Sequence, residues 1–407
     1  MGNPTNSDLA PGTQQEWVRA PLSRFFTSNV EVVDVDPSRI YPTVGVLNRG
    51  RGLLYRDPVA GSVTAYKKLN RIGPGVLVYS RLKAFEGAIT VTPADLPESF
   101  ASQEFPTFAF ASGMDPDFFR ILTTTQDMRD ALQGASRGMG GRRERVKPAD
   151  FLRIVMDFPP LPVQERIVEV ITAIEEQIAA LEIEANSLLQ VRYAALGDML
   201  SRGGEGWFSG PLSEAGTLIR GRRFVKSDYV ESGLGCIHYG QIYVDYGASA
   251  TCTVTHLPES FRLSMRLAQT GDVVIAGTSE NVEDVGKAVA WLGDDGVAVH
   301  DDCFIFRHDL DPKFVSYFFA SPLFQRQKRR FTSVTKVVRI SAQNLKKIIM
   351  PVPPRDEQER ISGMADVVDA QVVALRGEAE RLRQTRVALL SGLLDRTIDI
   401  KSAELEV

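Results

Sequence analysis

Two stretches of the chain carry apolar residues at alternating spacings of four and three, with polar and charged residues between them. This heptad pattern runs from Ile167 to Leu188 and again from Ala365 to Leu382. It is typical of a helix that buries a narrow seam against a partner helix. We therefore predict two long helices, over residues 159–203 and 353–400. The predicted seam positions are Ile171, Ile174, Ile178, Leu181 and Leu188 in the first helix and Val368, Val372, Leu375 and Leu382 in the second.

The two helices belong to a longer internal repeat. A shift of 194 positions places Arg145 on Arg339 and, without a gap, carries the first helix onto the second. A weaker match at a shift of 196 extends upstream, where Asp115 meets Asp311. The repeated unit is therefore about half the chain: a globular segment followed by a long helix.

In both globular segments, short apolar runs alternate with turns that contain glycine, as in residues 73–79 and 271–276. This texture predicts strand-rich α+β domains over residues 15–158 and 206–352, closed by helical stretches near 117–132 and 312–330. The predicted fold class is α+β, with two similar domains that are each followed by a long helix. The helices are expected to form an antiparallel coiled coil with pseudo-two-fold symmetry. A coiled coil between two copies of the chain is the alternative.

The bulk composition limits the class of protein. With 407 residues and 43% hydrophobic content, each half can build its own core. The chain has no apolar run long enough to span a membrane and no signal-peptide pattern at its start, so we expect a cytoplasmic protein without membrane contact. Its three cysteines include no Cys-x-x-Cys pair, which agrees with a reducing compartment.

The net charge of -4 is unevenly distributed. Residues 323–347 carry eight basic side chains and no acidic one, and residues 137–147 carry five basic side chains and one acidic. Local basic stripes, rather than the charge of the whole chain, are typical of phosphate binding. A solvated charged surface is the usual alternative for a single run. Because both stripes precede the same boundary in the repeat, we favour nucleic-acid binding.

The segments that join each domain to its helix are closely similar. They are Phe158-Pro-Pro-Leu-Pro-Val-Gln-Glu-Arg-Ile167 and Val352-Pro-Pro-Arg-Asp-Glu-Gln-Glu-Arg-Ile361, with Val163 in the first where the second has Glu357. With these two segments and the run from Gly75 to Ala88, the chain resembles the specificity subunit of type I restriction-modification enzymes over essentially its whole length.

The resemblance implies a non-catalytic DNA-binding subunit. Each globular domain would recognise one half of a bipartite, asymmetric target in double-stranded DNA, and the helical rod would set the spacing between the halves. The implied partners are two methyltransferase (modification) subunits and the restriction subunits. S-adenosylmethionine, ATP and Mg²⁺ would act on those partners, and we expect no cofactor in this chain.

The residues themselves agree that catalytic motifs are missing. The chain has no Asn-Pro-Pro-Tyr methyltransferase motif, and residues 277–287 are too long for a Walker A loop. The spacings Cys236-x-His238 and His300-x-x-Cys303 are not standard for zinc, so we expect no metal site. Two alternatives remain: an autonomous nuclease or methyltransferase, and a coiled-coil scaffold that binds only proteins.

The candidate DNA contacts were chosen by chemical type at loop positions. Arginine and lysine reach phosphates and guanine edges, whereas asparagine and glutamine pair with adenine. For each of them a surface charge or a structural hydrogen bond is the alternative, and Arg81 and Glu86 can pair with each other. The candidates in the first domain are Arg49, Arg51, Lys67, Lys68, Tyr79, Arg81, Lys83, Arg142 and Arg143. Those in the second are Arg220, Arg222, Arg223, Lys226, Tyr239, Gln241, Asn281, Ser333, Thr335 and Lys336.

Overall fold

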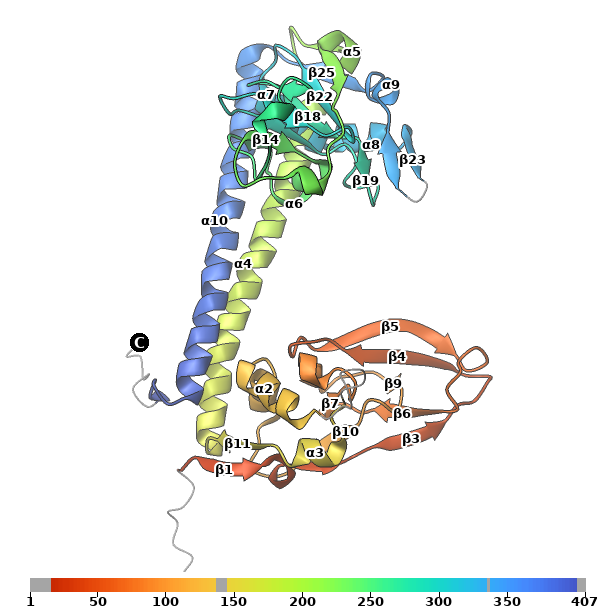
Figure 1. Ribbon diagram of the computed structural model, residues 1–407, viewed down its shortest axis with the longest axis vertical. Helices are drawn as coiled ribbons and strands as arrows, with labels where there is room; N and C mark the ends of the chain where they lie inside the picture. Colours follow the sequence, from red (N-terminus) through yellow and green to blue (C-terminus); the bar gives the residue numbers. More distant parts are fainter. Residues whose placement is uncertain (1–15, 137–144, 335–336, 401–407) are drawn as a thin grey trace, which may run out of the picture. The chain divides into compact units, whose positions relative to one another are not determined.

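The computed structural model describes residues 16–136, 145–334 and 337–400, and the chain divides into two compact units. The first unit comprises Met1–Ile178 and Glu380–Val407, and the second comprises Ala179–Ala379 (Figure 1). Each unit combines β-sheets with helices, so the expected α+β class is confirmed. The candidates Arg142, Arg143, Thr335 and Lys336 lie outside the described residues.

The first unit is built on three sheets. A five-stranded sheet has the order β3-β6-β9-β4-β5, a four-stranded sheet has the order β2-β10-β7-β8, and β1 pairs with β11. The strands are β1 (Val18–Pro21), β2 (Phe26–Ser28), β3 (Glu31–Asp34), β4 (Ile40–Val46), β5 (Leu53–Ala60), β6 (Lys68–Ile72), β7 (Leu77–Tyr79), β8 (Ile89–Val91), β9 (Ser99–Ala101), β10 (Thr107–Phe110) and β11 (Val155–Phe158). Its shorter helices are α1 (Pro116–Leu122), α2 (Gln126–Ala135) and α3 (Pro148–Leu152).

The second unit repeats this plan with different sheets. A five-stranded sheet has the order β13-β22-β18-β20-β15, followed by sheets β16-β14-β21-β17 and β19-β24-β23 and the pair β12-β25. The strands are β12 (Phe208–Pro211), β13 (Thr217–Arg220), β14 (Leu234–Ile237), β15 (Ser249–Ala250), β16 (Thr255–Leu257), β17 (Leu267–Ala268), β18 (Val273–Ala276), β19 (Thr278–Ser279), β20 (Ala288–Trp291), β21 (Val297–Val299), β22 (Cys303–Arg307), β23 (Thr332–Val334), β24 (Val338–Ile340) and β25 (Ile349–Val352). Its shorter helices are α5 (Leu212–Ala215), α6 (Tyr239–Val244), α7 (Pro312–Ala320), α8 (Pro322–Lys328) and α9 (Ala342–Leu345).

The helical stretches predicted near 117–132 and 312–330 are each two helices. Thr125 accepts a hydrogen bond from the backbone N–H of Met128 and so starts α2 as a new helix. Ser321 caps α8 in the same way, with Pro322 in the first helical position. Both predicted stretches are therefore helical, and these side-chain caps divide each of them into two helices.

Two long helices, α4 (Leu161–Arg202) and α10 (Arg355–Leu394), contribute to both units. In the second unit Arg192 forms an ion pair with Asp369, and the Arg376 Nη2 lies 3.5 Å from the Asn186 Oδ1. In this unit later positions on α4 therefore contact earlier positions on α10, and the two segments are antiparallel.

The first unit has its own contacts between the same helices. Arg386 Nη2 lies 2.6 Å from Glu175 Oε1, and Ile171 shares a core with Leu390. The seam thus finds its partner within one chain. Of the predicted seam, Ile171, Ile178, Leu181 and Val372 are buried, and Ile174, Leu188, Val368, Leu375 and Leu382 are half-buried. The second helix ends at Leu394, earlier than the predicted 400, and Arg396 adopts a positive φ of 66° just after it.

One glutamine in each unit fixes how the long helix starts. Gln164 accepts a hydrogen bond from the backbone N–H of Asp115 at 2.8 Å and donates to the carbonyl of the proline five residues upstream at 2.8 Å. Gln358 makes the same two bonds, with Asp311 N–H and with the proline five residues before it, both at 2.8 Å. Asp115 and Asp311 cap α1 and α7. The repeated sequence motif therefore produces the same two glutamine hydrogen bonds in each unit, which we call the glutamine device.

Each unit buries one main apolar core that includes the ends of the long helices. In the first unit, Phe26 packs against Phe119 with ring centroids 4.6 Å apart, and Ile167 belongs to the same core. In the second, Phe314 shares a core with Leu196 and Ile361. Within the described residues, no helix is both long and apolar enough to cross a membrane.

Candidate nucleic-acid interface

The second unit has a hollow of about 430 Å³ whose lining is mostly charged or aromatic. Strand β13 and the loop after it reach the hollow from one side, and the turn after β21 and strand β24 from others. Among its described lining residues, four cations face two carboxylates. These charged residues are Arg220, Arg223, Lys226, Arg339, Asp301 and Asp302. The excess of cations suits an anionic ligand.

A glycine allows the basic segment to approach this turn closely. A Cβ built on Gly221 would lie 2.2 Å from the His300 carbonyl oxygen and 2.3 Å from that of Val299, so no larger residue fits. The Arg222 N–H donates to the Val299 carbonyl at 2.9 Å. The backbone around Gly221 is therefore pressed against the turn, and this places the neighbouring Arg220 beside Asp301.

The basic residues of the hollow differ in how they are held. Arg220 Nε donates to the Asp301 carbonyl at 2.8 Å, and its Nη2 lies 3.7 Å from the Asp301 Oδ2. The side chains of Arg223, Lys226 and Arg339 make no hydrogen bond or ion pair with other described residues. The protein thus fixes the orientation of one arginine side chain. The other three cationic side chains can change conformation to contact a ligand.

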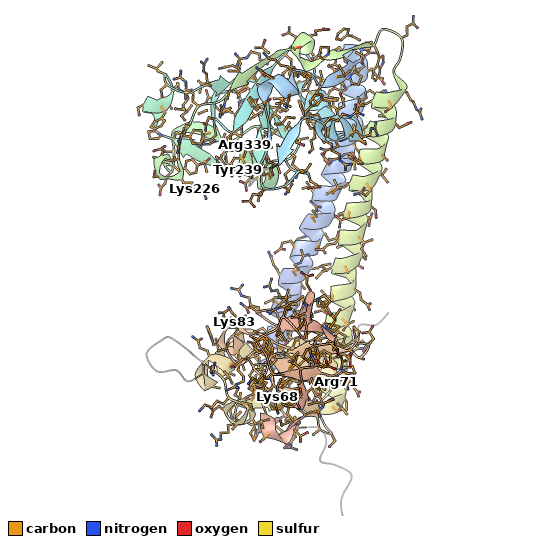
Figure 2. All side chains as sticks on the ribbon, turned by 90° about the vertical axis from the view of Figure 1, so that its right-hand side faces the viewer. Lys68, Arg71, Lys83, Lys226, Tyr239 and Arg339 are labelled. Carbon is orange, nitrogen blue, oxygen red and sulfur yellow. The ribbon has the colours of Figure 1, made fainter. Side chains whose placement is uncertain are left out.

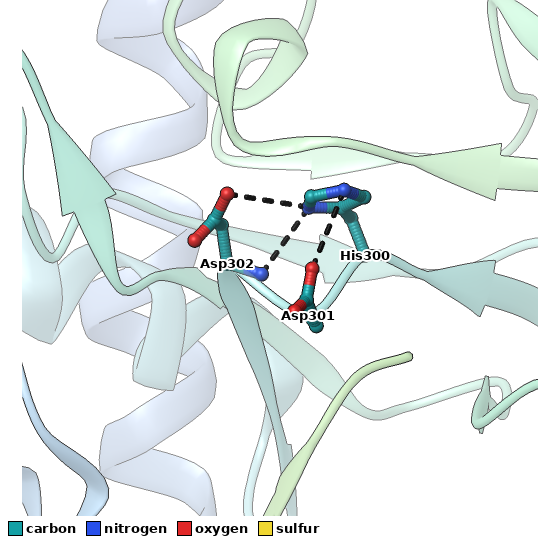
Figure 3. Close-up of side chains that lie close together, drawn as sticks. All are labelled: His300, Asp301 and Asp302. Atoms are coloured by element: carbon teal, nitrogen blue, oxygen red, sulfur yellow. Dashed lines mark hydrogen bonds and ion pairs between the residues drawn. The ribbon is translucent and has the colours of Figure 1, made fainter. Parts of the chain in front are cut away.

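His300 holds the turn together (Figure 3). Its Nδ1 accepts a hydrogen bond from the Asp302 N–H at 3.2 Å, so the ring carries its proton on Nε2, which bonds the Phe224 carbonyl at 3.0 Å. The Asp301 and Asp302 carboxylates lie 3.4 and 3.6 Å from the ring nitrogens. This is the one group of potential metal ligands in the described part of the chain, but both nitrogens are already used. A structural role for His300 explains the geometry better than metal binding.

A second hollow of about 550 Å³ shares Lys226, Tyr229 and His238 with the first. Burial lowers the pKa of His238 to about 4, so its ring is neutral at pH 7. The Tyr239 ring contacts this histidine at a tilt of 40°, with ring centroids 4.2 Å apart, and Figure 2 shows it on the same side of the unit as Lys226 and Arg339. An aromatic surface beside cations suits the flat faces of bases as well as phosphates.

Three of the predicted second-domain contacts are already used within the protein. Gln241 is buried; its Oε1 accepts from the His238 N–H and its Nε2 donates to Thr255, so it stabilises the start of α6. Its amide therefore has a structural role, and the residue also lines the second hollow. Arg222 Nη1 donates to the Ser264 carbonyl at 2.7 Å, away from both hollows. Asn281 is exposed, but its amide bonds Asp284.

The other second-domain candidates fall into two groups. Arg220, Arg223, Lys226 and Tyr239 line the hollows. The backbone of Ser333 pairs with Arg339 between β23 and β24. Arg339 itself was not among the predicted contacts. Val338 and Ile340 are buried, and Arg339 between them is exposed. The matching apolar-polar-apolar alternation in the sequence is the signal that could have identified Arg339.

In the first unit, carboxylates hold three of the six predicted cations that the structure describes. Lys68 lies 3.6 Å from Asp34, and Lys83 pairs with Glu86 at 3.0 Å. Arg81 lies 3.8 Å from Glu104, so the expected alternative pairing of Arg81 with Glu86 does not occur. Figure 2 shows Lys68 and Lys83 in this unit.

The remaining first-unit cations are exposed. Arg51 Nε donates to the Asn48 carbonyl at 3.0 Å. Arg49 adopts a φ of 61°, and neither its side chain nor that of Lys67 has a partner among the described residues. These three remain candidate contacts.

Tyr79 is not a DNA contact. Its side chain is fully buried, and its hydroxyl donates to the Val146 carbonyl at 3.2 Å. It ends an unbroken buried run in β7, which is why it belongs to the core and not to a loop. A separate hollow of about 360 Å³ in this unit is lined by Arg56 and Tyr66, neither of which was predicted.

The fold thus consists of two similar but distinct α+β units that share one pair of antiparallel helices. No family model matches the chain. Over 292 residues it is 21% identical to the type I restriction enzyme MjaVIII specificity subunit of Methanocaldococcus jannaschii, a match that covers 67% of this chain and 68% of that protein. It is 24% identical over 201 residues to the type I restriction enzyme EcoKI specificity subunit of Escherichia coli, covering 47% of this chain and 43% of that one.

A solved structure gives the same picture of the fold. It is described as the structural basis of complex assembly and conformational transition of the type I R-M system. One of its chains matches 96% of this chain with 99% of its own length, at a TM-score of 0.58 and 20% identity. At this identity the likeness concerns the fold alone. The expected resemblance to type I specificity subunits is confirmed by the two specificity-subunit relatives.

Proposed function

We propose that this chain is the DNA-recognition subunit of a type I restriction-modification complex. Each unit binds one half of a bipartite target, and the helix pair sets the distance between the halves. The chain itself catalyses nothing. Its two curated relatives are specificity subunits of this class of enzyme, which supports the assignment.

The observation that carries the proposal is the contrast between shared and divergent parts of the two units. The start of each long helix is fixed by the same glutamine device, at Gln164 and Gln358. The paired strands beside it also correspond, β1 with β11 and β12 with β25. The order β2-β10-β7-β8 is also repeated by β13-β22-β18-β20, whereas the other sheets, β3-β6-β9-β4-β5 in the first unit and β16-β14-β21-β17 and β19-β24-β23 in the second, differ in strand number and order. Such a protein has one scaffold with two different recognition surfaces, as an asymmetric target requires.

The second unit offers the chemistry for such a surface. Three cations without a partner among the described residues line a hollow next to half-buried tyrosine rings. Phosphates bind cations, and neutralising them releases counterions from DNA. A protein-only scaffold would have no need for unpaired cations around a polar hollow.

The chemistry of modification and cleavage would come from partners. We place S-adenosylmethionine on two methyltransferase subunits, and ATP and Mg²⁺ on the restriction subunits, with none of the three bound by this chain. The protein would work in the cytoplasm, where these molecules and the DNA are found.

The test is to express the chain with its methyltransferase subunit in a host without modification systems and to sequence the methylated positions. The expected result is a motif of two unlike halves separated by unspecified bases. Cells with the methyltransferase subunit alone are the control and should show no such motif. Methylation that does not depend on this chain would refute the proposal, and the chain would then be a scaffold.

A further inference from the structure

We propose that Arg220, held by Asp301, recognises a guanine in the half-site bound by the second unit, and that Arg223, Lys226 and Arg339 bind the phosphates beside it. This inference rests on the proposed DNA-recognition function. Of the four cationic side chains in this hollow, one would contact a specific base, and the other three would bind DNA of any sequence.

The division follows from how each cation is held. Recognition of a base edge needs a fixed donor geometry, because two hydrogen bonds must form in the plane of the base. The Asp301 carbonyl accepts from Arg220 Nε at 2.8 Å, and the Asp301 carboxylate lies 3.7 Å from Nη2. These contacts orient the guanidinium and leave Nη1 and the outer N–H of Nη2 free. The side chain is 64% exposed, so a ligand can reach it.

Guanine is the base that fits this donor pair. Its major-groove edge offers two acceptors, O6 and N7, whereas adenine presents one acceptor and one donor, and cytosine presents a donor. A guanidinium has only donors, so it is matched by guanine and opposed by the amino groups of the other two.

The remaining cations lack such orientation. Arg223, Lys226 and Arg339 have no side-chain partner among the described residues, and they come from two separate segments, the loop after β13 and strand β24. Long unheld side chains suit phosphates, which accept donors from many directions. Together they would fix a strand of DNA so that the oriented Arg220 faces a base.

Asp301 is a positioning residue in this scheme. It acts through Arg220, and the turn that carries it is fixed by the two hydrogen bonds of His300. Replacing the Asp301 carboxylate removes the contact with Nη2 and keeps the carbonyl that accepts from Nε, so it should partly loosen Arg220 without removing any donor to DNA. This gives a second variant that does not change Arg220 itself.

The experiment uses the chain with its methyltransferase subunit and compares methylated motifs by sequencing. Arg220→Lys keeps the charge but loses the planar fork. It should relax one position of one half-site, a position that is guanine in the wild-type motif, and weaken cognate binding by roughly 5- to 150-fold. Asp301→Asn should relax the same position. Arg262→Lys is the matched control, because Arg262 pairs with Glu259 in the same unit and lines neither hollow.

The phosphate group is tested by titrating cognate and scrambled DNA at several salt concentrations. Arg339→Gln should weaken both equally and reduce the salt slope by about 1, with the motif unchanged. Strict motifs in both Arg220→Lys and Asp301→Asn would overturn the guanine assignment, as would relaxation at a position other than guanine. A wild-type chain without any motif would instead refute the proposed function, so the two failures are distinguishable.

Discussion

Arg192 on α4 forms an ion pair with Asp369 on α10, and the chain contains a second copy of this pair. Advancing Arg192 by 194 positions gives Arg386, and moving Asp369 back by the same number gives Glu175, which is the residue that Arg386 contacts at 2.6 Å. The internal repeat is therefore present in the contacts between the helices as well as in the sequence. If the two helices are exchanged, each of these two ion pairs is placed on the other. This symmetry is expected for an antiparallel pair formed by two copies of one ancestral segment.

We predict that Asp369→Ala destabilises the fold by about 1–3 kcal/mol, because it removes charge-assisted hydrogen bonds that are partly buried. Asp369 also accepts a hydrogen bond from the Tyr317 hydroxyl at 2.9 Å. The measurement is the free energy of unfolding in urea. The control is Asp198→Ala, since the pair of Asp198 with Arg202 is largely exposed and should contribute less than about 1 kcal/mol. Equal effects of the two variants would contradict the prediction.

A second prediction concerns the glutamine device. Gln358→Ala should cost about 1–3 kcal/mol, because it leaves the buried proline carbonyl and the Asp311 N–H without their partner. Gln164→Ala should cost a similar amount for the same reason. Gln384, which is exposed on α10, serves as the control and should tolerate alanine. Urea unfolding of the three variants decides the matter, and a tolerated Gln358→Ala would show that the device is dispensable.

Lys328 should make stability depend on pH in an unusual direction. It is 1% exposed and donates to the Glu283 and Val285 carbonyls at 2.8 Å each. Burial lowers its pKa from 10.5 to about 8, an effect that the nearby Glu283 and Asp284 charges oppose. Between these two pH values the unfolded chain binds more protons than the folded one, so stability rises with pH.

The expected result is that wild-type stability gains relative to Lys328→Met as the pH rises from 8 to 10, by up to about 1.4 kcal/mol per pH unit. Comparison with the variant removes the contributions of other groups. Lys347→Met, at an exposed position, should show no such trend against wild type. A difference that stays constant over this range would mean that the pKa of Lys328 is not lowered.

The helix pair is predicted to act as a ruler. Inserting seven residues into both α4 and α10 preserves the seam and adds about 10 Å to each helix. On DNA this corresponds to roughly three more base pairs between the half-sites. Five-residue insertions are the control, because they turn the seam by roughly 140° and should abolish function. An unchanged spacer in the heptad variant would refute the ruler.

The sequence predicted the long helices well because a heptad seam is a local, periodic signal. Strands were found where apolar runs were bounded by glycine, as at β18 and β7. Helix breaks were missed, although Thr125 and Ser321 are ordinary capping residues. Each cap has helical residues within a few positions on both sides, so the break is short.

Site residues were harder to predict, because chemical type does not determine which way a side chain faces. Tyr79 and Gln241 were chosen as polar or aromatic loop residues, but one completes a buried strand and the other caps a helix. Arg339 was passed over, since its place beside Arg223 depends on the fold bringing β24 next to the loop after β13. Such juxtapositions are set by tertiary packing, and the alternation around Arg339 indicates only that its side chain is exposed.

The most direct test of modular DNA recognition is to replace residues 15–158 with the corresponding domain of a relative and to sequence the methylated motif. We predict that one half of the motif changes while the other half and the spacer stay the same, because each unit has its own core and its own surface. A motif in which both halves change together, or in which neither does, would contradict the claim that the two units recognise DNA independently.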